Sequence, residues 1–278
     1  MIESDVRGGA AAAAEAGWRR VVAMERINNF RDYGDLPTRG GGRVRKGLLF
    51  RSAHHARASA ADAARLTELG ITTVTDLRHP GEQAEQPSTW RGSLVIEVIE
   101  EAAPADGEPA VAPHNAALAN SDFSADAMAA YLQGHYGTMP FDPRHVRLWR
   151  RYFAALAERE GGMLIHCAAG KDRTGILAWL THHVLDVHPD DRLADYLMSN
   201  EAAAIAERLP MVQRRLEQLY ARSIAPEALL AMLTVRPEFM DNALRAIGEH
   251  SGSVDAYLEA VLGVDAARRE AIRARLIG

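Results

Sequence analysis

One short stretch of the sequence, residues 166–175, carries side chains that together could handle phosphate esters. It consists of His-Cys-Ala-Ala-Gly-Lys-Asp-Arg-Thr-Gly, and Cys167 is the only cysteine among 278 residues. Cys167 and Arg173 stand six positions apart, with a glycine between them. A thiolate is a strong nucleophile, and a guanidinium can bind two oxygens of one phosphate. The pattern predicts attack of the Cys167 sulfur on phosphorus and a cysteinyl-phosphate intermediate.

The flanking residues predict that this stretch turns from a strand into a helix. Residues 163–165 are apolar and follow two glycines, whereas Ile176, Leu180 and Val184 recur at helical spacing after the stretch. In such a turn, backbone N–H groups and the positive end of the helix dipole face one bound anion. The predicted phosphate cradle consists of Ala168, Ala169, Gly170, Lys171, Asp172, Arg173 and Thr174.

The stretch resembles the signature of the cysteine-dependent protein tyrosine phosphatases, which is His-Cys, five residues, Arg and Ser or Thr. The exact sequence of residues 167–175, Cys-Ala-Ala-Gly-Lys-Asp-Arg-Thr-Gly, is similar to that of a bacterial family of tyrosine and lipid phosphatases. Weaker blocks of that family occur in the same order from about Val21 to the C-terminus: Asn29–Asp32, Leu49–Ser52, Asp76–Arg78 with Glu82, Arg236–Phe239 and Gly252–Leu258. The resemblance implies a phosphomonoester hydrolase for phosphotyrosine, with phosphoserine, phosphothreonine and phosphoinositides as further candidate substrates.

Other interpretations of the loop fit less well. A buried structural cysteine would not explain the glycine, lysine, arginine and threonine around it. A nucleotide-binding loop requires Ser or Thr after its lysine, but Asp172 follows Lys171. Rhodanese-like sulfur transferases and arsenate reductases lack the Arg-Thr-Gly helix start and the distal blocks. A catalytically idle phosphate-binding module is disfavoured because a nucleophile, an arginine and a candidate acid are all present.

Three aspartates are candidates for the general acid that protonates the leaving oxygen. The resemblance implies Asp172, which could instead form an ion pair that shapes the loop. The acid role is favoured for Asp172 because no Trp-Pro-Asp segment precedes the cysteine. Asp142, in Met-Pro-Phe-Asp-Pro, is the nearest match to such a segment and is the second candidate. Asp76 lies near the end of a predicted strand, where it can face the pocket, and is the third candidate, although it could simply orient Arg78 or Arg173.

Other polar residues of these blocks have supporting roles in this interpretation. His166 is expected to brace or tune the nucleophile rather than to transfer a proton. Lys171 is either a positive charge at the pocket rim, suited to substrates with extra phosphates, or a solvated lysine. Arg78 and Glu82 are expected to form a structural pair.

The histidines offer no convincing metal site. His54 and His55 are adjacent and His79 lies elsewhere, without further ligands at regular spacing. The proposed chemistry needs neither a metal nor an organic cofactor. We therefore expect none.

Composition bounds the remaining possibilities. The chain is 47% hydrophobic and 25% charged, and its net charge of −5 argues against a general nucleic-acid binder. A single cysteine permits no intrachain disulfide, which fits a reducing compartment. No apolar run approaches the roughly 20 residues needed to cross a bilayer. The expected protein is cytoplasmic, with secretion left open, without stable membrane insertion. Its expected partners are phosphorylated proteins or phosphoinositides, and inorganic phosphate is its product.

The expected fold is α/β, with a mostly parallel central sheet flanked by helices and a helical C-terminal half. Predicted strands cover residues 21–24, 48–50, 71–77 and 94–99. A helix should follow the Ser59–Asp62 capping box and stop at Gly70, and another should cover residues 144–159. Further helices should start at Pro189, Pro210, Pro226, Pro237, Ser253 and Asp265.

The expected domain organisation is a mobile tail at residues 1–20 and a single phosphatase domain at residues 21–278. A mobile loop is expected from Glu100 to Asn120, which is rich in Ala, Pro, Glu, Gly and Asn. Residues 201–233 form a helical segment that is either a lid over the pocket, as the resemblance implies, or an ordinary packed pair. The underside of such a lid would consist of Leu209, Val212, Leu216 and Leu219.

Overall fold

The computed structural model describes residues 20–101 and 123–278. The predicted tail lies outside this part except for Arg20, and so does the predicted loop except for Glu100 and Glu101. Within the described residues, no helix has both the length and the apolar character that crossing a bilayer requires.

A five-stranded sheet with the order β1-β2-β5-β3-β4 forms the centre of the fold. The four strands β2 to β5 run parallel, and β1 is antiparallel at one edge. Strand β5 lies in the middle of the sheet. The segment that follows it, which begins at Cys167, therefore lies at the carboxyl edge of the sheet. The strands are β1 (Arg31–Asp32), β2 (Leu49–Ser52), β3 (Ile71–Asp76), β4 (Glu97–Ile99) and β5 (Gly162–His166).

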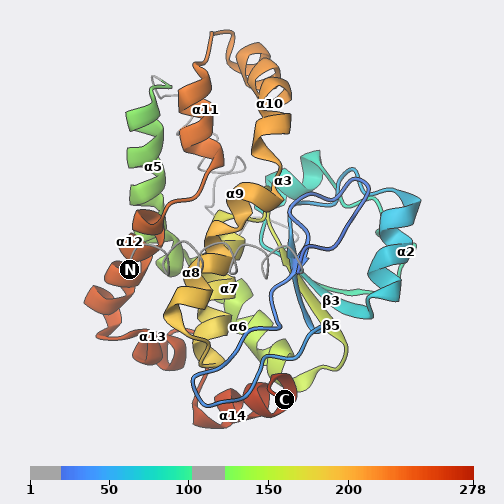
Figure 1. The fold of residues 1–278 in the computed structure, drawn as a ribbon, viewed down its shortest axis with the longest axis vertical. Coiled ribbons are helices and arrows are strands. Elements are labelled where there is room, and N and C mark those ends of the chain that lie inside the picture. The colour runs from blue at the N-terminus through green and yellow to red at the C-terminus, as the bar shows by residue number, and fades with distance from the viewer. Residues whose placement is uncertain (1–19, 102–122) are drawn as a thin grey trace, which may run out of the picture.

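Helices cover both faces of this sheet, so the predicted α/β class is confirmed (Figure 1). Side chains of β5 alternate between the faces: Leu164 packs with Leu66 of α2, whereas Met163 and Ile165 join the larger core with α6 and α7. The helices are α2 (Ala60–Glu68), α3 (Pro80–Glu85), α5 (Ala125–Thr138), α6 (Pro143–Glu158), α7 (Asp172–Val184), α8 (Pro189–Leu197), α9 (Ser199–Ala202), α10 (Ile205–Tyr220), α11 (Pro226–Leu233), α12 (Pro237–Ser251), α13 (Val254–Ala260) and α14 (Ala266–Leu276), with a 3-10 turn at Met139–Phe141.

Most predicted element boundaries are confirmed, and the capping box is the clearest case. Ser59 Oγ accepts a hydrogen bond from Asp62 N (3.2 Å), and Asp62 accepts one from Ser59 N (3.1 Å). The strand predicted at residues 21–24 is wrong. That segment meets the edge of the sheet through one bridge, between Val21 and Arg31, and the partly buried side chains of Val22 and Met24 pack on the α2 face.

The helix start predicted at Pro210 is also wrong, whereas those at Pro189, Pro226, Pro237, Ser253 and Asp265 are confirmed. Helix α10 begins at Ile205, so Pro210 lies inside it. Proline lacks an N–H and is best tolerated in the first turn of a helix. Here the five residues before Pro210 are already helical, and the helix begins only after Ala204, whose φ of 47° is left-handed.

Helix α11 packs beside α5, and α10 packs beside α11, at one end of the molecule (Figure 1). They share a small apolar cluster with α5, separate from the two cores on the sheet. Leu209 and Leu216 of the predicted lid underside contact this cluster and are therefore partly buried against other helices.

Candidate active site

The conspicuous decapeptide connects the central strand β5 to helix α7, as predicted. Cys167 follows the last residue of β5 and is 2% exposed. Helix α7 begins at Asp172, two residues earlier than predicted, so Arg173 lies in its first turn. The backbone N–H groups of a first helical turn lack partners within the helix, which favours a bound anion at this point.

The carbonyl groups of residues 168–170 are held on the outside of the loop. His54 N donates to the first (3.2 Å), Asn29 Nδ2 to the second and third (3.0 Å each), and Arg51 Nη2 to the third (3.0 Å). In a trans peptide the N–H points away from the preceding C=O. The N–H groups of residues 169–171 therefore face the opposite side, where a phosphate would lie.

Gly170 is required by the geometry of this loop. Its φ is +70°, and a Cβ atom added there would lie 2.3 Å from Ser52 O. Any larger residue would push the loop away from β2 and disturb the orientation of its peptide groups.

Arg173 is clamped by Glu82 of α3. Arg173 Nη1 donates to Glu82 Oε2 (2.6 Å) and Nη2 to Glu82 Oε1 (3.0 Å), while Nη1 also donates to Leu77 O (3.3 Å). Burial disfavours the charged form, but the charge of Glu82 outweighs it and raises the pKa of Arg173 above its usual value. These described contacts use three of five N–H donors and leave Nε–H and one Nη2–H, which share one edge of the guanidinium and suit two phosphate oxygens.

The expected pair between Arg78 and Glu82 is therefore wrong. Glu82 binds Arg173, and Arg78 binds Asp76 through contacts of 2.7 to 3.2 Å. Helix α3 turns the Glu82 carboxylate back towards the start of the helix, where it also accepts a hydrogen bond from His79 N (2.7 Å). Sequence spacing could not indicate this placement, because it depends on how the short helix α3 packs against the start of α7.

The Glu82 clamp leads to the first prediction. Replacing Glu82 with glutamine removes the charge and one acceptor oxygen, so Arg173 should lose its fixed orientation. We expect phosphate to inhibit the variant about tenfold more weakly, because a hydrogen bond to a charged group contributes about 1.5–3 kcal/mol. Glu85→Gln, an exposed change on the same helix, is the matched control. Equal inhibition constants for the two variants would contradict the clamp.

Asp172 receives two hydrogen bonds on one carboxylate oxygen. Tyr136 OH donates to Oδ1 (2.9 Å) and Lys171 Nζ donates to the same atom (3.1 Å). The Asp172 side chain remains 21% exposed, so it can reach a bound substrate. The tyrosine was not among the residues singled out from the sequence.

Both interpretations of Lys171 from the sequence are wrong. Lys171 is 6% exposed, and besides Asp172 its ammonium group binds Met232 O (2.7 Å), with Thr234 O farther away (3.5 Å). It is neither solvated nor a free charge at the rim. It ties the phosphate loop to the end of α11 instead.

The other two candidate acids have structural partners. Asp76 receives the guanidinium and the backbone N–H of Arg78. Asp142 caps helix α6 by accepting hydrogen bonds from Arg144 N (2.9 Å) and His145 N (3.1 Å). Asp172 is therefore the candidate whose carboxylate belongs to the loop itself.

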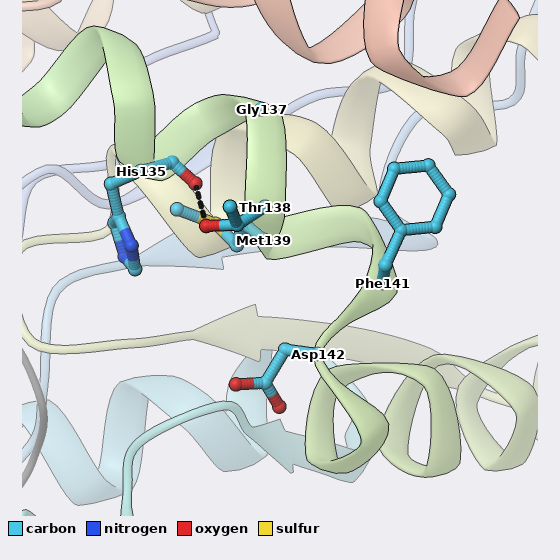
Figure 2. A pocket seen from close by; sticks show the side chains of 6 residues that line it. All are labelled: His135, Gly137, Thr138, Met139, Phe141 and Asp142. Carbon is cyan, nitrogen blue, oxygen red and sulfur yellow. Dashed lines mark hydrogen bonds between the residues drawn. The ribbon is translucent and has the colours of Figure 1, made fainter. Parts of the chain in front are cut away.

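Asp142 also borders an open pocket of about 390 Å³, shown in Figure 2. In this view Asp142 extends from the start of α6, and Thr138 donates to the carbonyl of His135 at the end of α5 (3.1 Å). None of the residues that line this pocket belongs to the phosphate loop; they are His135, Gly137, Thr138, Met139, Phe141 and Asp142.

His166 is fully buried beside the nucleophile. Burial, and secondly the charge of Arg78, lower its pKa well below 6.5, so the ring is neutral. Neither ring nitrogen has a hydrogen-bond partner among the described residues, and the ring stacks on His55 at 4.6 Å. Asp76 Oδ2 is 3.7 Å from Nε2. These contacts favour a bracing role.

The other histidines are engaged separately. His55 interacts with Ser52 Oγ (2.9 Å) and accepts a hydrogen bond from Trp90 Nε1 (2.8 Å), while His79 caps α3. Across residues 20–101 and 123–278, no three His, Cys, Asp or Glu side chains gather in a way that could hold a metal ion.

Comparison with known proteins identifies the family of this chain. Residues 22–278 match the model of the tyrosine phosphatase family. The chain belongs to this family. It is 36% identical to a candidate tyrosine-protein phosphatase of Cupriavidus necator, over 93% of this chain and 90% of the relative. It is 30% identical to the triple specificity protein phosphatase PtpB of Mycobacterium tuberculosis, over 90% and 96%. Both relatives are named as phosphatases, which gives no support to an idle binding module.

Behind the loop of this phosphatase lies a buried ion cluster centred on Asp195 of α8. Asp195 binds Arg20 (2.8 Å), Arg51 (2.7 Å) and Arg31 (3.5 Å). Burial alone would raise the pKa of Asp195, but the three arginines hold it well below its usual range. Because Arg51 also binds Gly170 O, the cluster supports the phosphate loop from below. This ion cluster could not be predicted from the sequence, because Asp195 is more than 140 positions away from the three arginines.

This cluster leads to the second prediction. Asp195→Asn leaves three arginines without their counter-ion, so at neutral pH the free energy of unfolding should fall by about 3–5 kcal/mol. Because the folded-state pKa of Asp195 is lowered, its contribution is present above the unfolded-state pKa and is lost as pH falls. The difference from the unchanged protein should therefore begin to shrink below about pH 4. Urea denaturation at several pH values measures it.

An exposed ion pair provides the control for Asp195. Glu68 pairs with Arg65 on the surface of α2. Glu68→Gln should change the free energy of unfolding by less than about 1 kcal/mol at any pH. If Asp195→Asn were equally mild, the cluster would not stabilise the fold as argued.

Proposed function

We propose that this chain hydrolyses phosphotyrosine esters through a phosphocysteine at Cys167. The observation that carries the proposal is the orientation of the loop: its carbonyl groups are bound from outside, and Arg173 keeps one two-donor edge open. Together these donors match the oxygens of a phosphoryl group. They can stabilise the charge that develops on those oxygens as phosphorus is attacked.

In the first step the sulfur of Cys167 attacks phosphorus. The S–P bond forms, the ester P–O bond breaks, and the leaving oxygen takes a proton from the Asp172 carboxyl group. Arg173 and the loop N–H groups hold the three remaining phosphoryl oxygens during this transfer.

In the second step water releases the phosphate. The Asp172 carboxylate accepts a proton from the water that attacks phosphorus, the P–S bond breaks, and inorganic phosphate leaves. Thr174 Oγ1 is buried and has no hydrogen-bond partner among the described residues. Thr174 is one of the predicted cradle residues, and its hydroxyl keeps a donor that no described residue uses.

The substrate range extends beyond phosphotyrosine in this proposal. The support is the relative PtpB, whose name gives it triple specificity. Phosphoserine, phosphothreonine and phosphoinositides are the further substrates proposed. Because Lys171 is already bound by Asp172 and Met232, it is not the group that would select extra phosphates.

A side-by-side assay tests the function and its breadth. Phosphate release is measured from phosphotyrosine, phosphoserine and phosphothreonine peptides and from phosphoinositides, each with and without a metal chelator. Turnover of the phosphotyrosine peptide should persist with chelator. Phosphate binding without any turnover would instead favour an idle binding module.

Residues 201–233 form a lid over the pocket in this proposal. Two features support it: the separate cluster that α10 and α11 share with α5, and left-handed alanines at both ends of α10, with φ of 47° at Ala204 and 51° at Ala221. Such strained residues are common at sites of movement. The segment would then limit access to Cys167.

Peroxide provides the third prediction. Leu216→Asp should loosen α10 from its cluster, and peroxide should then inactivate the enzyme several-fold faster, with phosphate protecting it. Met211→Asp, on the exposed side of the same helix, should leave the rate unchanged. Equal inactivation rates for both variants would favour a fixed, packed pair of helices.

A further inference from the structure

A buried chain of hydroxyl groups ends on the carboxylate of Asp172. Tyr196 OH donates to Tyr136 OH (2.8 Å), and Tyr136 OH donates to Asp172 Oδ1 (2.9 Å). The two tyrosines come from α8 and α5, and both are fully buried. Neither belongs to the loop or to the sequence blocks around it.

The direction of this chain is fixed by its chemistry. Burial, and secondly the charge of Asp172, raise the pKa of both Tyr136 and Tyr196 well above 10, so both hydroxyls stay protonated. Because Tyr136 accepts the hydrogen of Tyr196, its own hydrogen is directed at Asp172. The Tyr136 hydroxyl therefore stays protonated near neutral pH and can donate a hydrogen bond to the carboxylate of Asp172.

The surrounding packing holds the Tyr136 ring in place. The ring packs against Tyr196, with centroids 6.3 Å apart, and against Phe239 at 5.6 Å. Gly175 makes room for Tyr196, because a Cβ atom there would lie 3.0 Å from that ring. The glycine that follows Thr174 thus lets the tyrosine pair approach the start of α7 closely.

The two oxygens of Asp172 are not equivalent. Oδ1 receives both Tyr136 and Lys171, whereas no hydrogen bond reaches Oδ2 from the described parts of the chain. We propose that Tyr136 is the positioning residue of the general acid: it fixes Oδ1 of Asp172 and leaves Oδ2 to carry the proton given to the leaving oxygen. This inference rests on the proposed function, in which Asp172 is that acid.

Several other groups act on Asp172 and must stay constant in any test by pH. The tyrosine pair interacts with it most directly. The remaining titratable or charged neighbours come from α5 and from the loop itself: Tyr131, His135, Lys171 and Arg173. A substitution that changes only the Tyr136 hydroxyl keeps all of them.

Tyr136→Phe is that substitution, since it keeps the ring and its packing. We expect hydrolysis of alkyl phosphates to slow about tenfold, and that of an activated nitrophenyl phosphate to change little, because only the poor leaving group needs a well-placed proton. The hydrogen bond from Tyr136 favours the ionised carboxylate. Its loss should favour the protonated form, so the basic limb of the pH–rate profile should move to higher pH by about one unit.

Two comparisons make this test specific. Tyr33→Phe removes a buried tyrosine–tyrosine hydrogen bond of 2.7 Å in the core, and it should affect neither the leaving-group dependence nor the pH profile. In an Asp172→Asn background, Tyr136→Phe should have no further effect on alkyl phosphates.

The outcomes separate this inference from the proposed function. The positioning role is overturned if Tyr136→Phe slows all substrates alike or leaves the pH profile unchanged. It is also overturned if Tyr136→Phe slows alkyl phosphates by the same factor in the Asp172→Asn background as in the unchanged enzyme. If Asp172→Asn alone leaves the leaving-group dependence unchanged, the assignment of the acid fails, and the role of Tyr136 fails with it.

Discussion

Replacing Cys167 with serine is expected to lower turnover by a factor on the order of 10⁶ while the protein continues to bind phosphate. A serine hydroxyl is scarcely ionised at neutral pH, so it cannot replace the thiolate as nucleophile. The loop N–H groups and the open edge of Arg173 do not depend on the sulfur. Turnover of a phosphotyrosine peptide and calorimetric titration with inorganic phosphate measure the two properties separately.

The unchanged enzyme provides the matching positive result. Rapid acid quenching during turnover should reveal a protein heavier by one phosphoryl group, and Cys167→Ser should not show that species. Residual activity above about 1% in the variant would exclude a phosphocysteine on the main reaction path. Loss of phosphate binding together with turnover would show that the thiol also shapes the cradle.

The phosphate loop could be predicted from sequence because its chemistry and geometry are local. Apolar residues 163–165 specify a buried strand, and the spacing of Ile176, Leu180 and Val184 specifies the helix that follows. Gly170 marks a sharp turn, although only the structure shows the close approach to Ser52 that requires it. Sequence periodicity therefore located the loop within two residues.

The partners of the loop could not be predicted in the same way. Glu82 and Tyr136 reach Arg173 and Asp172 only because α3 and α5 pack beside the carboxyl edge of the sheet. Lys171 resembled a surface charge in sequence, since nothing local indicates that the end of α11 covers it. Long-range packing decides these contacts, and a single sequence carries little information about it.

The mistaken elements have a related cause. Residues 21–24 are apolar enough for a strand, but they form a single bridge to the sheet, and only Val22 and Met24 pack, partly buried, on the α2 face. Pro210 resembles a helix start, yet the residues before it continue the helix. In both cases local propensity agreed with the prediction and tertiary packing overrode it.

Replacing Asp172 with asparagine should reduce hydrolysis of alkyl phosphates by about 10²–10⁴, the usual contribution of a general acid. An activated nitrophenyl phosphate should be affected far less, because its leaving oxygen departs readily as an anion. Asparagine keeps the shape of the side chain and can still accept a hydrogen bond from Tyr136, so the loop should remain in place. Steady-state rates over a series of leaving groups, each measured across pH, provide the test.

The other two aspartates serve as controls for this experiment. Asp142→Asn should largely keep the cap of α6, because asparagine caps a helix about as well as aspartate, and it should leave leaving-group discrimination unchanged. Asp76→Asn should weaken the contact with Arg78, so it should lower stability more than leaving-group discrimination. If Asp172 only shaped the loop, its replacement would slow every substrate alike and weaken phosphate binding. If the dependence on leaving group instead appeared in Asp142→Asn or Asp76→Asn, the acid would be that residue. The nucleophile and the arginine would keep their roles, because neither depends on the source of the proton.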